Sequence, residues 1–272
     1  MKRSVPKRLN LRKTLFLLPN LITLSAIFCG FDSIRLSASA EGDGDLFRAA
    51  VLIVFAMFFD ALDGRVARMT KTQSAFGLQI DSLADVISFG VAPGMLVYHW
   101  TLHRFELLGL FVSFCFTAAA AVRLARFNVL SMGEAGKPAK PSKYFLGLPT
   151  PGAAGLLVSI VIANHAVGGA MGGAQYAPHV LVLSFTLALL MVSNVEFRTF
   201  KQVQLDTRTL GFLAFTLLSS LAIGTQLAPA FVLPWLLGCY LVLGLVESAW
   251  RLPGRIRTRR REARAAAASS EP

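Results

Sequence analysis

The sequence predicts an all-α protein, a polytopic transmembrane helical bundle of about eight spans with both termini in the cytoplasm. Three observations predict this class. Of the 272 residues, 54% are hydrophobic and only 15% are charged. The apolar residues fall in runs of about 20, the length that a helix needs to cross a bilayer. The Lys and Arg residues lie between those runs, so the net charge of +12 does not indicate a nucleic-acid-binding module.

The expected spans divide the chain into one membrane domain and two basic ends. They cover 15–36, 47–63, 79–98, 106–129, 148–167, 179–196, 209–228 and 230–249. Together they form a transmembrane domain over 15–250, which follows a basic N-terminal segment, 1–14. A basic tail, 251–272, closes the chain, and its end is rich in Ala and Ser and is expected to be disordered.

The distribution of positive charge predicts how the bundle is oriented. Of the 27 Lys and Arg residues, all but Arg35, Arg48 and Arg104 fall on the side that holds both termini and the loop at 64–78. Cytoplasmic loops carry the excess of Lys and Arg. We therefore expect an integral protein of a bacterial inner membrane, with that loop facing the cytoplasm.

Four aspartates, Asp60, Asp63, Asp81 and Asp85, lie within this apolar background. A helical period places 60 and 63 on one face and 81 and 85 on another, so two helix ends can present four carboxylates to one point. Ionisable groups at membrane depth are costly and mark functional sites. Like charges so close need compensation, and divalent cations with oxygen ligands supply it. The pattern predicts a site for Mg²⁺ or Mn²⁺, with room for two ions.

Small and basic residues accompany the acidic faces. Gly64, Ala67 and Gly77 would let a phosphate or nucleotide approach the backbone closely. Arg68 and Lys71 can supply positive charge to that phosphate. A collar of internal ion pairs at the membrane interface is the alternative, but it has no need for small residues facing the charges.

The segment from Asp60 to Asp85 matches the pattern D-x2-D-G-x2-A-R-x8-G-x3-D-x3-D at every fixed position. It resembles the CDP-alcohol phosphatidyltransferase family. The resemblance implies an integral membrane enzyme that joins an alcohol to the phosphatidyl group of a CDP-linked lipid and releases CMP. It implies a homodimer and divalent metal held by the motif aspartates.

The resemblance also assigns roles to matching positions. Asp60, Asp63 and Asp81 would bind metal, and Asp85 would be a ligand or the general base, so that Asp81 and Asp85 are the catalytic pair. Residues bordering the CDP moiety would be the metal ligands Asp60 and Asp63 together with Gly64, Ala67, Arg68 and Gly77. The stretch Leu18 to Thr23 resembles the first helix of the family, which adds Asn20 and Thr23 to the CDP site.

Three flanking stretches resemble the phosphatidylserine synthase branch: Ser88 to Pro93, Arg123 to Asn128, and Phe145 to Pro151. This implies CDP-diacylglycerol as donor and L-serine as acceptor. Candidate groups for the acceptor or a lipid phosphate are Lys71, Ser88, Arg123, Arg126 and Asn128. Arg123 and Arg126 can bind a carboxylate or a phosphate, although anchoring at the membrane interface explains them equally well.

Two other functions fit parts of the pattern. The more similar alternative is the same reaction with choline, glycerol 3-phosphate or an inositol phosphate as the acceptor. A phosphorylated acceptor would require a further basic pocket. An ion-coupled transporter is the more distant one. Transporters built from repeats show matching interrupted spans in both halves, and no second acidic cluster follows residue 100.

Overall fold

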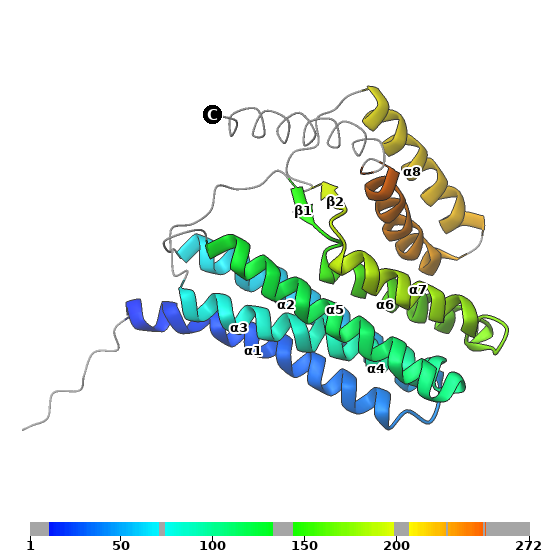
Figure 1. Ribbon diagram of the computed structural model, residues 1–272, viewed down its shortest axis with the longest axis horizontal. Helices are drawn as coiled ribbons and strands as arrows, with labels where there is room; N and C mark the ends of the chain where they lie inside the picture. The colour runs from blue at the N-terminus through cyan, green and yellow to red at the C-terminus, as the bar shows by residue number, and fades with distance from the viewer. Residues whose placement is uncertain are drawn as a thin grey trace, which may run out of the picture.

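The protein is a bundle of long helices in the computed structural model, which describes residues 11–70, 74–132, 144–198, 207–226, 228–246 and 248 (Figure 1). The helices are α1 (Leu11–Ala38), α2 (Asp43–Thr70), α3 (Ala75–Asp85), α4 (Ala92–Trp100), α5 (Glu106–Met132), α6 (Thr150–Ala166), α7 (Ala177–Val192), α8 (Thr207–Gln226) and a last helix, 232–246. Short helical segments are η1 (Val86–Val91), η2 (Leu102–Phe105), η4 (Ala170–Gly172) and η6 (Pro229–Phe231).

The all-helical prediction is confirmed, and the structure adds one short strand pair to it. Strands β1 (Tyr144–Leu146) and β2 (Glu196–Arg198) pair antiparallel, with Phe145 opposite Phe197. Each strand is only three residues long, too short to show the period-2 pattern by which a strand is recognised in a sequence. The pair joins the segment before α6 to the segment after α7, beside the ends of these helices (Figure 1).

Helices lie where the spans were predicted, and four apolar segments support a membrane protein. Four helical segments among the described residues are long and apolar enough to cross a bilayer: Leu18–Ala38, Phe76–Trp100, Leu102–Leu130 and Pro229–Val246. Helices α6 and α7 are apolar but shorter. Helix α2 is as long as α1 but is not one of these four segments, and it contains the charged residues Arg48, Asp60 and Asp63. Of the predicted N-terminal segment 1–14, residues 11–14 belong to α1 and 1–10 lie outside the described residues, as does the predicted tail 251–272.

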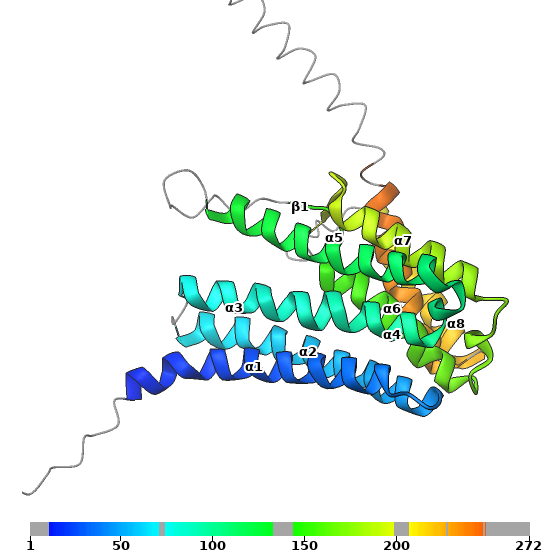
Figure 2. The same ribbon diagram turned by 60° about the horizontal axis from the view of Figure 1, so that its bottom comes forward.

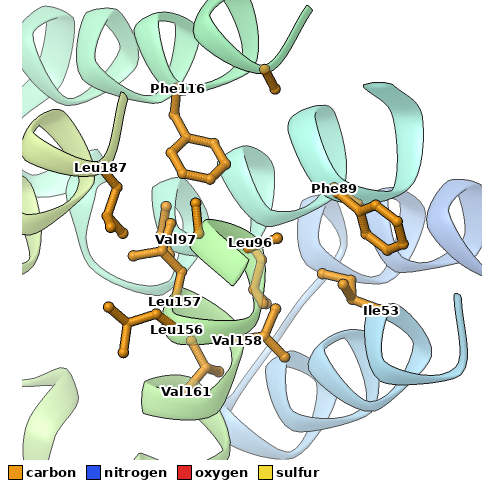
Figure 3. Close-up of a cluster of buried hydrophobic side chains, with 14 of the residues drawn as sticks. Ile53, Phe89, Leu96, Val97, Phe116, Leu156, Leu157, Val158, Val161 and Leu187 are labelled. Carbon is orange, nitrogen blue, oxygen red and sulfur yellow. The ribbon is translucent and has the colours of Figure 1, made fainter. Parts of the chain in front are cut away.

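Helices α1, α2, the continuous rod from α3 to α4, and α5 run alongside one another (Figure 2). Helix α6 packs against α2, and α7 packs against α5. The buried core lies where η1, α4, α5 and α6 meet. Phe89, Leu96, Phe116 and Leu157 are almost completely buried there (Figure 3). Many large apolar side chains on the outside of the bundle are exposed, as expected of a surface that faces lipid.

The rod from α3 to α4 contains a π-helical segment, η1, directly after Asp85. Two hydroxyls of α5 bind carbonyls of this rod: Ser113 Oγ donates to Gly94 O (2.6 Å), and Thr117 Oγ1 donates to Gly90 O (3.2 Å). On the other side, Ser88 Oγ donates to Ala26 O of α1 (3.0 Å). Small residues and hydroxyls of this kind let membrane helices pack closely. They hold the rod that carries Asp81 and Asp85 between α1 and α5.

Candidate active site

Two helices bring the motif aspartates together. Asp60 and Asp63 lie near the C-terminal end of α2, and Asp81 and Asp85 lie on α3. Carboxylate oxygens of Asp60, Asp63 and Asp81 all lie within 4.8 Å of one another. The side chains of Asp60 and Asp85 are also close enough to interact. The four carboxylates therefore form one group, as the spacing predicts.

This group fits a divalent cation. Three carboxylates at such separations repel one another unless a cation compensates their charge. Oxygen ligands are what Mg²⁺ and Mn²⁺ prefer in proteins. In addition, Asp85 Oδ1 is buried and has no hydrogen-bond partner among the described residues. The cluster could thus hold a metal through Asp60, Asp63 and Asp81, with Asp85 beside it.

Helix α1 supplies the hydrogen bond that orients one of these ligands. Thr23 Oγ1 donates to Asp63 Oδ2 at 2.5 Å, and Pro19 O lies 3.1 Å from the same hydroxyl. Thr23 and Asp63 are both buried, at 5% exposure each. The hydroxyl fixes which oxygen of Asp63 remains for a ligand. Thr23, predicted to border CDP, is therefore in the site and contacts a carboxylate.

The start of α3 lies beside α1. Ser74 caps this helix, because its Oγ accepts a hydrogen bond from Gly77 N (3.0 Å). A Cβ on Gly77 would lie 3.1 Å from Ser74 Oγ and 3.7 Å from Asn20 Oδ1. Gly77 thus serves the cap, and its backbone runs next to Asn20, another residue predicted to border CDP.

The other small residues of the motif lie on α2. Within the part of the chain that the structure describes, a Cβ added to Gly64 would meet no atom within 4 Å, so the backbone there is open to a ligand. Ala67, one turn further along, is half-buried. Arg68 is exposed, and its Nε donates to Gly64 O (2.9 Å), which keeps the guanidinium beside the same stretch of helix. Lys71 lies outside the described residues.

The predicted acceptor residues divide into two groups: Arg123 and Asn128 have contacts near the motif aspartates, whereas Arg126 and Ser88 bind other helices. Arg123 is 9% exposed, interacts electrostatically with Asp85, and donates from Nη1 to Thr150 Oγ1 (2.9 Å). Asn128 Nδ2 donates to Ser82 Oγ (2.8 Å), one residue from Asp81. Arg126 instead binds the end of α7, donating to Asn194 Oδ1 (2.6 Å) and Val192 O (3.4 Å). Ser88 is buried against α1.

Two residues near Arg123 were missing from the sequence-based prediction. Thr150 lies inside the stretch Phe145 to Pro151, so its neighbours offered a signal. Tyr240 comes from the last helix and interacts electrostatically with Arg123. Nothing in the local sequence around Tyr240 indicates a site, because its place beside Arg123 depends on how the last helix packs.

Comparison with known proteins decides the family. Residues 16–192 match the family model described as CDP-alcohol phosphatidyltransferase. The chain belongs to the CDP-alcohol phosphatidyltransferase family. The match includes the whole aspartate motif, most of α1, and α2 through α7, and it ends before α8 and the helix 232–246.

Curated relatives extend the likeness over most of this CDP-alcohol phosphatidyltransferase. A CDP-diacylglycerol–serine O-phosphatidyltransferase of Helicobacter pylori is 37% identical over 235 residues, which cover 86% of this chain and 91% of the relative. One from Mycobacterium bovis is 29% identical over 86% of this chain and 80% of the relative. An archaetidylserine synthase of Methanothermobacter thermautotrophicus is 35% identical over 66% of this chain and 69% of the relative.

Proposed function

We propose that this protein transfers the phosphatidyl group of CDP-diacylglycerol to the hydroxyl of L-serine, giving phosphatidylserine and CMP. The observation that carries the proposal is the group of motif carboxylates from Asp60, Asp63 and Asp81, with oxygens within 4.8 Å of one another. Such a group suits a metal that binds a pyrophosphate. The names of the relatives support serine as the acceptor.

The chemistry is a displacement at the phosphorus of the diacylglycerol-bearing phosphate. The serine Oγ forms a bond to phosphorus, and the bond from phosphorus to the CMP oxygen breaks. One or two Mg²⁺ or Mn²⁺ ions bound at Asp60, Asp63 and Asp81 would supply positive charge to the phosphate oxygens. Asp85 accepts the proton of the serine hydroxyl, and its buried oxygen, which has no hydrogen-bond partner in the described part of the chain, supports this role.

We assign the residues around the carboxylates to the two substrates, CDP-diacylglycerol and the acceptor. Thr23, Asn20, Gly64, Ala67, Gly77 and Arg68 border the CDP moiety. The open backbone at Gly64 supports close approach of a phosphate or the nucleotide. Arg123 binds the acceptor carboxylate or a lipid phosphate, with Asn128 on the same side. Arg126, Ser88 and Lys71 remain candidates for this side of the site.

The proposed setting is a homodimer of eight-span chains in a bacterial inner membrane, with the site and both termini facing the cytoplasm.

Single cysteines test the orientation of the protein in the membrane. After replacement of the native Cys29, Cys115 and Cys239, Ser74→Cys should react with an impermeant maleimide only in inside-out vesicles. Ser39, which directly follows the C-terminal end of α1, lies on the other side of the membrane in the proposed orientation, so Ser39→Cys should react only from the outside. The reverse pattern would overturn the orientation. Cross-linking in native membranes tests the dimer.

The first experiment measures CMP release from CDP-diacylglycerol by purified protein with Mg²⁺ or Mn²⁺. Serine, choline, glycerol 3-phosphate and inositol are compared, with Asp85→Asn as the inactive variant. The expected result is release with serine that chelation abolishes. Release with another alcohol would change the acceptor and keep the reaction class. No release with any of them would contradict the proposed function.

A further inference from the structure

The guanidinium of Arg123 is a buried charge, and the residues that the structure describes satisfy only part of its hydrogen-bonding capacity. It is 9% exposed and donates from Nη1 to the fully buried Thr150 at the start of α6. Its Nε is buried and has no hydrogen-bond partner among the described residues. Arg has five N–H donors, and a buried charge without partners is strongly destabilising. This arrangement favours an anionic ligand at Arg123.

Asp85 does not satisfy the charge of Arg123 directly. The two side chains interact electrostatically. The ion pairs among the described residues, with nitrogen to oxygen distances up to 4.0 Å, are Arg35 with Asp32 and Arg48 with Asp45, so Arg123 and Asp85 are further apart. Each has a buried atom for which the described residues supply no hydrogen-bond partner, Nε on Arg123 and Oδ1 on Asp85. A serine substrate carries a carboxylate for the first and a hydroxyl for the second.

The last helix brings Tyr240 to the same place. This helix packs closely on α6, because a Cβ on Gly155 would lie 3.4 Å from Leu237 Cδ1. Tyr240 Cε1 lies 4.0 Å from where a Cβ on Gly152 would stand, half a turn from Thr150. Tyr240 packs partly buried against the core and interacts electrostatically with Arg123. The glycines of α6 therefore make room for an aromatic ring beside the Arg123 and Thr150 pair.

We propose that Tyr240 is a positioning residue that, with Thr150, holds the Arg123 guanidinium so that its remaining N–H groups bind the carboxylate of the acceptor. The inference rests on the proposed function and deepens it. It gives the helix 232–246, which lies outside the family match, a part in acceptor specificity. A phenol suits this task because its dipole stabilises the cation without neutralising it. A carboxylate in its place would occupy Arg123 and compete with the acceptor.

Tyr240→Phe tests the proposal, because it keeps the ring and removes only the hydroxyl. We expect KM for serine to rise about tenfold, the size of effect of losing one polar partner of a charged group. We expect kcat and KM for CDP-diacylglycerol to stay within about twofold of the unchanged protein. The reason is that the lost interaction binds the acceptor equally in the ground state and in the transition state, so only KM for serine changes. Thr150→Val should act in the same direction.

Ethanolamine serves as the probe without a carboxylate, since it keeps the hydroxyl and the amine of serine. The preference for serine over ethanolamine should fall in Tyr240→Phe, while turnover of ethanolamine itself stays unchanged. Trp235→Phe is the matched control on the same helix, because it removes the bond from Trp235 Nε1 to Ser219 Oγ (2.9 Å) and leaves Arg123 untouched. Thermal unfolding in detergent checks that each variant is folded.

Three results would overturn the inference. An unchanged KM for serine in Tyr240→Phe would show that the hydroxyl does not act on the acceptor. A rise confined to KM for CDP-diacylglycerol would assign Arg123 to the lipid phosphate. Equal losses with serine and ethanolamine, matched by Trp235→Phe, would indicate a structural role only. Absence of serine-dependent CMP release by the unchanged protein is a separate result, which contradicts the proposed function and the inference together.

Discussion

Thr23 on α1 and Asp63 on α2 share a short hydrogen bond, 2.5 Å from hydroxyl to carboxylate, in the buried centre of the aspartate group. The two residues are forty positions apart in the chain. The bond joins the first helix to the motif and orients a proposed metal ligand. It makes α1 part of the site as well as a partner in the packing of α2.

Replacing Thr23 should therefore weaken metal binding. Thr23→Val keeps the shape of the side chain and removes the hydroxyl, and loss of a residue that orients a ligand costs about 10-fold to 100-fold in metal affinity or activity. We expect the Mg²⁺ or Mn²⁺ concentration for half-maximal CMP release to rise by at least about tenfold. Thr225→Val is the control, because that hydroxyl, among the described residues, bonds carbonyls of its own helix, Leu221 O and Ala222 O. An unchanged metal requirement would separate Thr23 from the ligand set.

Asp60→Asn should abolish activity and yet stabilise the metal-free protein. The carboxylates of Asp60, Asp63 and Asp81 lie within 4.8 Å of one another, so removing one relieves repulsion. With chelator present, the unfolding midpoint should rise by about 3 °C, corresponding to roughly 1 kcal/mol. Added metal should raise the midpoint of the unchanged protein, because it binds the folded state, and have little effect on the variant.

Asp45→Asn is the control for that experiment, since Asp45 lies at the opposite end of α2, in an exposed ion pair with Arg48. Surface pairs of this kind contribute about 0 to 1 kcal/mol. Metal should stabilise Asp45→Asn as it does the unchanged protein. If metal stabilised Asp60→Asn equally, Asp60 would not be a ligand.

Gly64→Ala should separate stability from function. Because a Cβ at this position meets no atom of the described residues within 4 Å, the fold accepts the methyl group. Replacing a helical Gly by Ala gains about 1 kcal/mol of helix propensity. We expect a higher unfolding midpoint together with a kcat/KM for CDP-diacylglycerol that is lower by about tenfold, or roughly 1.4 kcal/mol.

Gly238→Ala is the matched control for Gly64, because a Cβ there also meets no atom of a described residue within 4 Å. It lies on the last helix and not on the aspartate motif, and should raise stability with no loss of activity. Full activity in Gly64→Ala would argue that no substrate group approaches this backbone.

Gly30→Ala should have the opposite effect, a loss of stability. A Cβ on Gly30 would lie 2.7 Å from Ser88 Oγ and 2.9 Å from Ser88 Cα, so α1 would have to move away from η1. Overpacking of this kind costs about 1 to 3 kcal/mol. Measured in detergent, the unfolding midpoint should fall by several degrees. Ser88→Ala should not rescue it, because the contact with the backbone Cα remains; full rescue would show that the hydroxyl alone is the obstacle.

Local patterns explain why the spans and the motif were predictable. The expected span 106–129 lies within α5, Glu106–Met132, because a run of apolar residues of that length has one stable form in a membrane. Asp60 and Asp63 share a helix, as do Asp81 and Asp85, so the helical period alone predicts their faces. Whether the two pairs of aspartates lie close together depends on the tertiary fold. Their fixed separation in the motif nevertheless led us to expect that they do.

The sequence by itself determined where the helices lie, which carboxylates belong together and which family the motif resembles, because each of these depends on neighbours along the chain. The tertiary structure decided which remote residues complete the site. It placed Thr23 against Asp63 and Tyr240 beside Arg123, and it distinguished the open backbone of Gly64 from the closed contact of Gly30. The physical reason is that such contacts arise from the packing of whole helices, whose relative placement no local pattern of residues specifies.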